Sequence, residues 1–163
     1  MIIFAFPGTG KTSLAQKDKN FVDLELSEIK YNNSSVSHLT KEERKSLKRP
    51  LRSKDYKQVY TDRALALHKQ GKTVLAALNF LPRILKQMRK AGDSDFHIYI
   101  PKSSLRKEYL QRYQQRGNNK RFIAEVMVIW YPTLLSLTLA SHLWPDKISL
   151  LSSGQVLEDF MER

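Results

Sequence analysis

Cysteine is absent from the 163-residue sequence. This absence excludes disulfide bonds, thiolate metal sites and cysteine nucleophiles, and a reducing compartment is the simplest setting for such a chain. The histidines are too dispersed to show the spacing of metal ligands or of a catalytic triad; they are His38, His68, His97 and His142. Metal centres and triads built on these residue types are therefore not expected.

A basic leader is missing in front of the apolar run 2–6. That run is too short for a signal-peptide core or a membrane span before Pro7 and Gly8 interrupt it. We therefore expect a soluble, cytoplasmic protein with no membrane partner.

Acidic residues are scarce: 16 Asp and Glu stand against 28 Lys and Arg, which gives a formal net charge of +12. A field of this sign attracts anions such as nucleotides, polyphosphates, nucleic acid and acidic lipid surfaces. The charge alone does not select among them.

Apolar runs of strand length alternate with segments of helical period, which is typical of a parallel sheet with crossover helices. The expected strands are 2–6, 21–24, 73–78, 96–100 and 147–151. The later part of the chain predicts helices over 103–116 and 119–131, and a further apolar helix after Pro132. At this length the chain is expected to form one α/β sandwich domain over 1–163.

The strongest motif is Pro-Gly-Thr-Gly-Lys-Thr-Ser at 7–13, between the first expected strand and the first expected helix. A loop in this place points several backbone N–H groups into one concavity, where a polyphosphate can bind. Gly8 and Gly10 let the backbone approach phosphate oxygens in conformations closed to other residues. Lys11 can reach the β- and γ-phosphates, and the Thr12 hydroxyl is placed to bind Mg²⁺.

Segment 7–13 resembles the Walker A motif of the P-loop NTPases, with Ala5 where the motif has its first glycine. The resemblance implies that Mg²⁺ is bound by Thr12 and, through water, by Asp23. It also implies that ATP binds on Gly8, Thr9, Gly10, Lys11, Thr12 and Ser13. The alternative is a glycine turn that carries a solvated lysine.

Carboxylates stand at the end of the second expected strand and not at the end of the third. Asn79 stands where motor ATPases carry an acidic Walker B residue, and the Asn-Lys-x-Asp of switch GTPases is missing. Asp23-Leu24-Glu25 is similar to the acid-x-acid arrangement of small-molecule kinases, where such residues hold the acceptor or organise the metal. Asp23 and Glu25 share one side of the strand near the motif at 7–13, where either could accept a proton from an acceptor hydroxyl. The alternative is an ordinary pair of acids at a strand end.

Arginines four residues apart, Arg112 and Arg116, share one face of the expected helix 103–116. Paired guanidinium groups can neutralise the charge that spreads over a transferred phosphoryl group. The stretch is similar to the lid of adenylate-kinase-like enzymes, which implies a lid at about 102–121 with Gly117 as a hinge or cap. The alternative is a surface helix on which Glu108 and Arg112 form an ion pair.

Pro82-Arg83 directly follows the third expected strand and partly matches the Asp-Gly-Phe-Pro-Arg of nucleoside monophosphate kinases. The resemblance implies an acceptor-binding insertion at about 32–70, with Arg63 and Arg83 next to the acceptor. Gln155 follows the last strand, where such kinases hold the adenine. The alternative for these cations is a solvated surface.

The order of elements resembles compact bacterial or phage-type P-loop kinases of the adenylate-kinase-like (nucleoside and nucleotide kinase) group. That resemblance implies a three-layer α/β/α sandwich with a five-stranded parallel sheet in the order 2-3-1-4-5. It further implies transfer from ATP, with Mg²⁺, to a nucleoside monophosphate or nucleoside, catalysed by Lys11, Asp23, Glu25, Arg112 and Arg116. Two alternatives stay open: a nucleic-acid-binding protein or polynucleotide 5′-kinase, and an NTP-binding regulator that transfers nothing.

Overall fold

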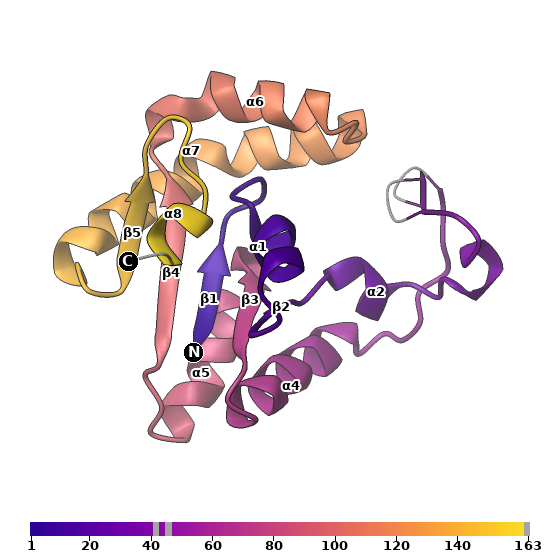
Figure 1. Ribbon diagram of the computed structural model, residues 1–163, viewed down its shortest axis with the longest axis horizontal. Coiled ribbons are helices and arrows are strands. Elements are labelled where there is room, and N and C mark those ends of the chain that lie inside the picture. Colours follow the sequence, from indigo (N-terminus) through magenta and orange to yellow (C-terminus); the bar gives the residue numbers. More distant parts are fainter. Residues whose placement is uncertain (41–42, 45–46, 162–163) are drawn as a thin grey trace.

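The computed structural model describes residues 1–40, 43–44 and 47–161 and contains one sheet of five parallel strands (Figure 1). The strands are β1 (Ile2–Ala5), β2 (Phe21–Asp23), β3 (Thr73–Ala77), β4 (Phe96–Pro101) and β5 (Ile148–Leu151). Their order is β2-β3-β1-β4-β5, which is the order that the resemblance implied. β1 pairs with β3 on one side and with β4 on the other, so the loop that leaves it emerges in the middle of the sheet edge.

Helices connect consecutive strands and cover both faces of the sheet (Figure 1). Short 3₁₀ turns occur at Ser34–Val36, Leu78–Phe80 and Ser103–Leu105. The helices are α1 (Lys11–Lys17), α2 (Leu26–Lys30), α4 (Tyr56–Lys69), α5 (Leu81–Lys90), α6 (Arg106–Gln115), α7 (Lys120–Leu143) and α8 (Glu158–Met161).

The core is divided by the sheet because successive side chains of a strand point to opposite faces. Ile2 and Phe4 of β1 belong to the larger cluster, which includes residues of α4, α5, α6 and α7. Ile3 and Ala5 belong to the smaller cluster, which includes Leu14 of α1 and residues around α8. Helix layers on both faces agree with the predicted α/β sandwich.

A helix break at Pro132 was expected from the sequence, and this prediction is wrong. α7 is continuous from Lys120 to Leu143 with Pro132 inside it. Proline leaves the carbonyl four residues earlier without its helical partner, but here both Val128 and Pro132 are exposed, so water can bind that carbonyl. Trp130 and Leu134 are fully buried on either side of Pro132 and hold both halves of α7 to the core.

By length and composition alone, α7 is the one helix among the described residues that could cross a membrane. One of its faces is nevertheless part of the protein core, through Val126, Trp130 and Leu134. Its opposite face is solvent-exposed and apolar.

Trp130 joins α7 to the rest of the core. Its ring packs edge-on against Phe6 at 5.3 Å and lies 5.2 Å from the ring of Tyr109, and its indole N–H donates to the Ser103 carbonyl at 2.8 Å. α7, α6 and the end of β1 therefore meet at one buried aromatic side chain.

We expect Trp130→Ala to lower the free energy of unfolding by about 3–5 kcal/mol, because it leaves a cavity and an unpaired carbonyl. Trp144→Ala is the matched control, since that ring is 55% exposed and should cost much less. Urea unfolding followed by far-ultraviolet circular dichroism measures both. Equal losses in the two variants would contradict the role given to Trp130.

Candidate active site

The loop of residues 7–13, here called the P-loop after the motif that it resembles, joins β1 to α1 at the carboxyl edge of the sheet. Gly8 and Gly10 have φ angles of +82° and +95°, in the left-handed region that favours glycine. The Thr9 side chain is fully buried and its hydroxyl donates to the Phe6 carbonyl at 2.8 Å. Glycine and threonine thus fix the loop as a curve of backbone amides, a form that suits an anion.

Lys11 lies over the inside of this curve. Its Nζ donates to the carbonyls of Ala5 at 3.1 Å and Phe6 at 3.3 Å. Burial lowers the pKa of Lys11 to about 8, the Asp23 carboxylate opposes this change, and Arg116 adds to it. A polyphosphate beside Lys11 would favour the charged ammonium, since an anion compensates for burial.

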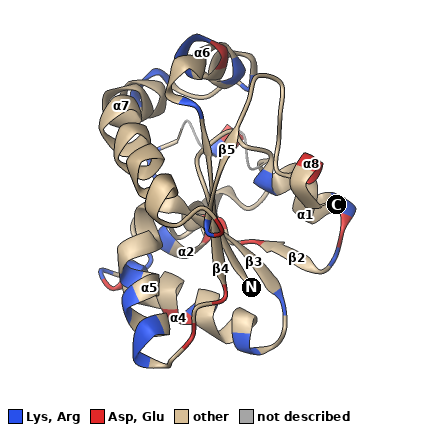
Figure 2. Cartoon of the chain, turned by 90° about the vertical axis from the view of Figure 1, so that its left-hand side faces the viewer, with Lys and Arg blue, Asp and Glu red and all other residues tan. Residues whose placement is uncertain are grey.

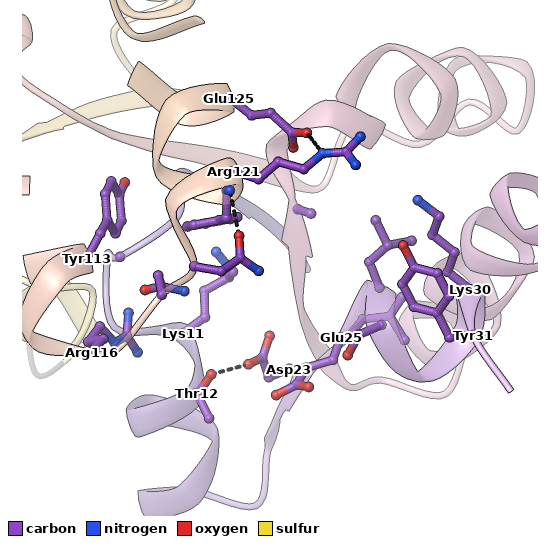
Figure 3. A pocket seen from close by; sticks show the side chains of 18 of the residues that line it. Lys11, Thr12, Asp23, Glu25, Lys30, Tyr31, Tyr113, Arg116, Arg121 and Glu125 are labelled. Atoms are coloured by element: carbon purple, nitrogen blue, oxygen red, sulfur yellow. Dashed lines mark hydrogen bonds and ion pairs between the residues drawn. The ribbon is translucent and has the colours of Figure 1, made fainter. Parts of the chain in front are cut away.

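Thr12 and Asp23 meet across the loop although they come from α1 and β2. The Thr12 hydroxyl donates to Asp23 Oδ2 at 2.6 Å, and Figure 3 shows this contact beside Lys11. Glu25 lines the same cavity two residues later. Both acids of the predicted acid-x-acid pair therefore line one cavity, and Asp23 contacts the P-loop directly.

Hydroxyl and carboxylate oxygens are hard ligands of the kind that Mg²⁺ prefers. Among the described residues no three His, Cys, Asp or Glu side chains gather as a metal site. Mg²⁺ usually keeps several waters and takes one or two carboxylates plus substrate phosphates, so Thr12 and Asp23 fit the ion as part of a nucleotide complex.

The cavity at this edge has a volume of about 1040 Å³ and is open to solvent. The P-loop and Asp23 form its floor, α2 forms one wall, and the turn between α6 and α7 forms the other (Figure 3). Leu47, Lys48 and Arg49 also line the cavity. Besides Lys11, its cationic lining residues are Lys30, Lys48, Arg49, Arg116 and Arg121. Acidic lining residues are fewer: Asp23, Glu25 and Glu125.

α6 packs directly against the P-loop. Tyr109 and Tyr113 are buried, and the Tyr113 hydroxyl donates to the Pro7 carbonyl at 2.8 Å. A Cβ on Gly8 would lie only 2.9 Å from Cε1 of Tyr113. The absence of a side chain at Gly8 is therefore what allows this close packing.

The two predicted lid arginines do not point together. Arg116 lines the cavity, whereas Arg112 donates to Glu108 Oε1 at 2.6 Å and to the Gly8 carbonyl at 3.4 Å. The second carboxylate oxygen of Glu108 accepts from the Ser153 hydroxyl at 2.8 Å. Arg112 in this conformation braces the loop, because its guanidinium is held between Glu108 and Gly8.

The turn after α6 carries the other polar groups of this wall. Gly117 has a φ of +67°, its N–H donates to the Gln114 carbonyl and the Asn118 N–H donates to the Tyr113 carbonyl. This pattern is a Schellman cap, so the predicted capping role of Gly117 is confirmed. The Asn119 side chain then accepts from the Phe122 N–H at 2.8 Å and begins α7.

The cavity brings together part of the predicted set: Gly8, Lys11, Thr12, Asp23, Glu25 and Arg116. The remaining predicted residues do not line it: Thr9, Gly10, Ser13, Arg63, Arg83, Arg112 and Gln155. Gln155 instead accepts from the Ser152 N–H at 2.7 Å, within its own loop.

The expected acceptor contact at Arg63 and Arg83 is not present. α4 turns Tyr60 and Ala64 into the core, which leaves Arg63 on its exposed side. Arg83 is exposed on α5 and donates to the Gln58 side chain at 3.2 Å. Helical periodicity thus points both guanidinium groups away from the cavity.

Sequence reasoning did not single out Lys48 and Arg49, the cations that line the cavity beside α2. The chain folds back on itself there, since the Arg52 N–H donates to the Lys30 carbonyl and the Asn32 N–H to the Pro50 carbonyl, each at 2.9 Å. Arg49 then lies over the Tyr31 ring at 4.6 Å. The basic run around 41–57 was the available signal, but only the return of the chain selects Lys48 and Arg49 from it.

We expect Gly8→Ala to destabilise the protein more than Gly92→Ala. Both sites have positive φ, which costs alanine about 1–2 kcal/mol, but a Cβ at Gly92 meets no atom within 4 Å. The extra loss of unfolding free energy in Gly8→Ala over Gly92→Ala measures the collision with Tyr113. It should disappear when Gly8→Ala is made in a Tyr113→Ala background. Thermal or urea unfolding of the four variants tests this, and equal losses at both glycines would refute the close packing.

Comparison with protein-family models and with curated proteins gives no match for this chain.

Proposed function

We propose that this protein transfers a phosphoryl group from ATP to a small acceptor, a nucleoside monophosphate or a nucleoside, as a P-loop kinase of the adenylate-kinase-like group. The observation that carries the proposal is the hydrogen bond from Thr12 to Asp23 beside Lys11, at the mouth of a loop with two positive-φ glycines. These groups are an amide cradle, a cation and two oxygen ligands. A nucleoside triphosphate with Mg²⁺ requires all three.

On the donor side, the amides of the P-loop would hold the phosphates and Lys11 would neutralise their terminal oxygens. Thr12 and Asp23 would hold Mg²⁺, which would supply charge neutralisation at the phosphates. The carbonyls of Ala5 and Phe6, just before the P-loop, hold Lys11 near this position, from which its flexible stem can move to a phosphate.

On the acceptor side, Glu25 and Lys30 line the cavity across from Arg116 (Figure 3). Lys48 and Arg49 add further positive charge to this lining. The acceptor oxygen would form a bond to the γ-phosphorus while the bond from that phosphorus to the β–γ bridging oxygen breaks and ADP leaves. A hydroxyl acceptor would give its proton to Asp23 or Glu25, and a phosphate acceptor needs no base. Arg116 would neutralise charge on the group in transit.

The direct test is ATP turnover with Mg²⁺ against a panel of nucleosides and nucleoside monophosphates. We expect ADP to form together with a phosphorylated acceptor. Binding of ATP without turnover of any acceptor would favour the NTP-binding regulator. Phosphorylation of oligonucleotide 5′ ends would favour the polynucleotide kinase. Absence of any triphosphate-induced thermal stabilisation would refute nucleotide binding itself.

Lys11→Ala should reduce turnover on the order of 10²-fold or more, because it removes a cation from the γ-phosphate. Arg116→Ala should reduce kcat on a similar order with little change in ATP affinity, because its charge acts on the transferred group. Arg63→Ala is the matched control, since this arginine is exposed and lies outside the cavity. Steady-state kinetics distinguish these outcomes, and equal activity of the Arg116 and Arg63 variants would remove Arg116 from the mechanism.

A further inference from the structure

The outer face of α7 carries an unbroken row of exposed apolar side chains, here called the outer stripe: Val128, Pro132, Leu135, Leu139 and Leu143. Their spacing of three or four residues puts them on one side of the helix, opposite the buried Trp130 and Leu134. Val128 is 75% exposed, and Leu139 and Leu143 are each 71% exposed. A helix this apolar on both faces is typical of one that is covered on both faces.

Charge is absent along this helix over a long stretch. Between Glu125 and Asp146 the chain contains no Asp, Glu, Lys or Arg. Glu125 is itself paired with Arg121 at 2.9 Å. Aromatic residues stand along or beyond the stripe, with Tyr131 51% and Trp144 55% exposed. The outer face of α7 therefore offers a partner apolar contact and aromatic rings. It has no Asp, Glu, Lys or Arg side chain over this stretch that could form ion pairs with one particular protein partner.

Basic side chains flank the stripe. α5 contains four exposed cations and no acid: Arg83, Lys86, Arg89 and Lys90. Figure 2 shows the ribbon of α7 almost free of charged residues, with the basic ribbon of α5 below it and cations of α6 above it. On the α6 side the Arg106 guanidinium lies over the Tyr131 ring at 5.9 Å. The apolar surface is thus bordered by positive charge on both sides.

An apolar groove of about 370 Å³ lies between α5 and α7 next to Trp144. Leu85, Leu137 and Ala140 line it, and Arg89 and Lys147 contribute cations. Asp93 also lines the groove, but its carboxylate is paired with His68 at 2.8 Å. An aliphatic chain with an anionic head matches this lining, since the chain would meet Leu and Ala side chains and the head would meet Arg89 and Lys147.

From these features we propose that the outer stripe and the basic row of α5 dock on an anionic lipid bilayer. An anionic bilayer meets both the apolar side chains and the cations that border them. A second copy of this chain would cover the apolar side chains but would not neutralise the cations. Pairing two stripes would bring together two molecules of charge +12, with their basic α5 rows close to each other. The sequence alone predicted no membrane partner, because it does not show that the second face of α7 is left uncovered.

The proposed mode is attachment on the surface and not a membrane span. Val126, Trp130 and Leu134 belong to the protein core and cannot leave it without unfolding the α7 layer. The first turn of α7 and the residues before it line the large cavity, at the opposite end of α7 from Leu139, Leu143 and Trp144. This inference does not depend on the proposed kinase activity.

Sedimentation with vesicles tests the proposal on the full chain. We expect binding to vesicles of phosphatidylcholine mixed with phosphatidylglycerol, little binding to phosphatidylcholine alone, and weaker binding as salt is raised. Leu139→Glu should weaken binding about tenfold or more, because it puts a charge into the stripe. Val59→Glu is the matched control, since Val59 is an exposed apolar residue on α4, outside the surface, and should bind like the original protein.

Leu139 is exposed, so the Leu139→Glu variant should keep its fold, and circular dichroism checks this. A blue shift of Trp144 fluorescence on adding mixed vesicles, lost in Trp144→Ala, gives a second readout that needs no stripe variant. Failure to sediment with anionic vesicles, or equal effects of Leu139→Glu and Val59→Glu, would overturn the proposal. If light scattering shows a dimer that the Leu139→Glu substitution dissociates, and the protein does not bind vesicles, the stripe serves self-association instead.

Discussion

The hydrogen bond from Thr12 to Asp23 is the contact on which the candidate site depends. It joins the start of α1 to the last residue of β2. α1 follows β1, and β3 separates β1 from β2 in the sheet. Parallel strands bring their carboxyl ends to the same edge, so a loop after β1 and an acid after β2 face each other there. Moving the carboxylate by one position along β2 would turn it to the other face of the sheet, because strand side chains alternate.

The packing of α6 on the P-loop is the second constraint. Tyr113 fits against Gly8 because glycine has no side chain, and the same tyrosine accepts the Asn118 N–H through its carbonyl at the helix end. The loop conformation and the position of Arg116 are thus linked through one short helix. In this conformation α6 is a packed wall of the site, with Arg112 turned to Glu108 and Arg116 turned to the cavity.

The excess of positive charge has two locations with different consequences. In the cavity, cations surround three carboxylates and face a space of about 1040 Å³, which suits a phosphorylated small molecule. On the outside, the cations of α5 border an apolar helix face, which suits an extended anionic surface. A net charge of +12 read from composition cannot separate these two, because it contains no information on which cations share a concave or a convex surface.

Local pattern was sufficient for the strands, the P-loop glycines and the acid pair, because each depends on neighbours within a few residues: burial of a strand, positive φ at Gly8 and Gly10, alternation from Asp23 to Glu25. Local pattern failed at Pro132, where burial of Trp130 and Leu134 outweighed the missing backbone donor. It failed again at Arg63 and Arg83. Other residues of α4 and α5 face the core, so both arginines are left exposed on the outer sides of these helices.

What the sequence by itself determined is therefore the alternation of strands and helices, the parallel sheet, and a loop at 7–13 that turns on two positive-φ glycines. Only the tertiary structure decided which cations enter the cavity, that Arg112 braces the loop, and that one face of α7 is left in solvent. The reason is physical: backbone conformation responds to adjacent residues, whereas the surroundings of a charged or apolar side chain are set by segments that meet only after the chain has folded.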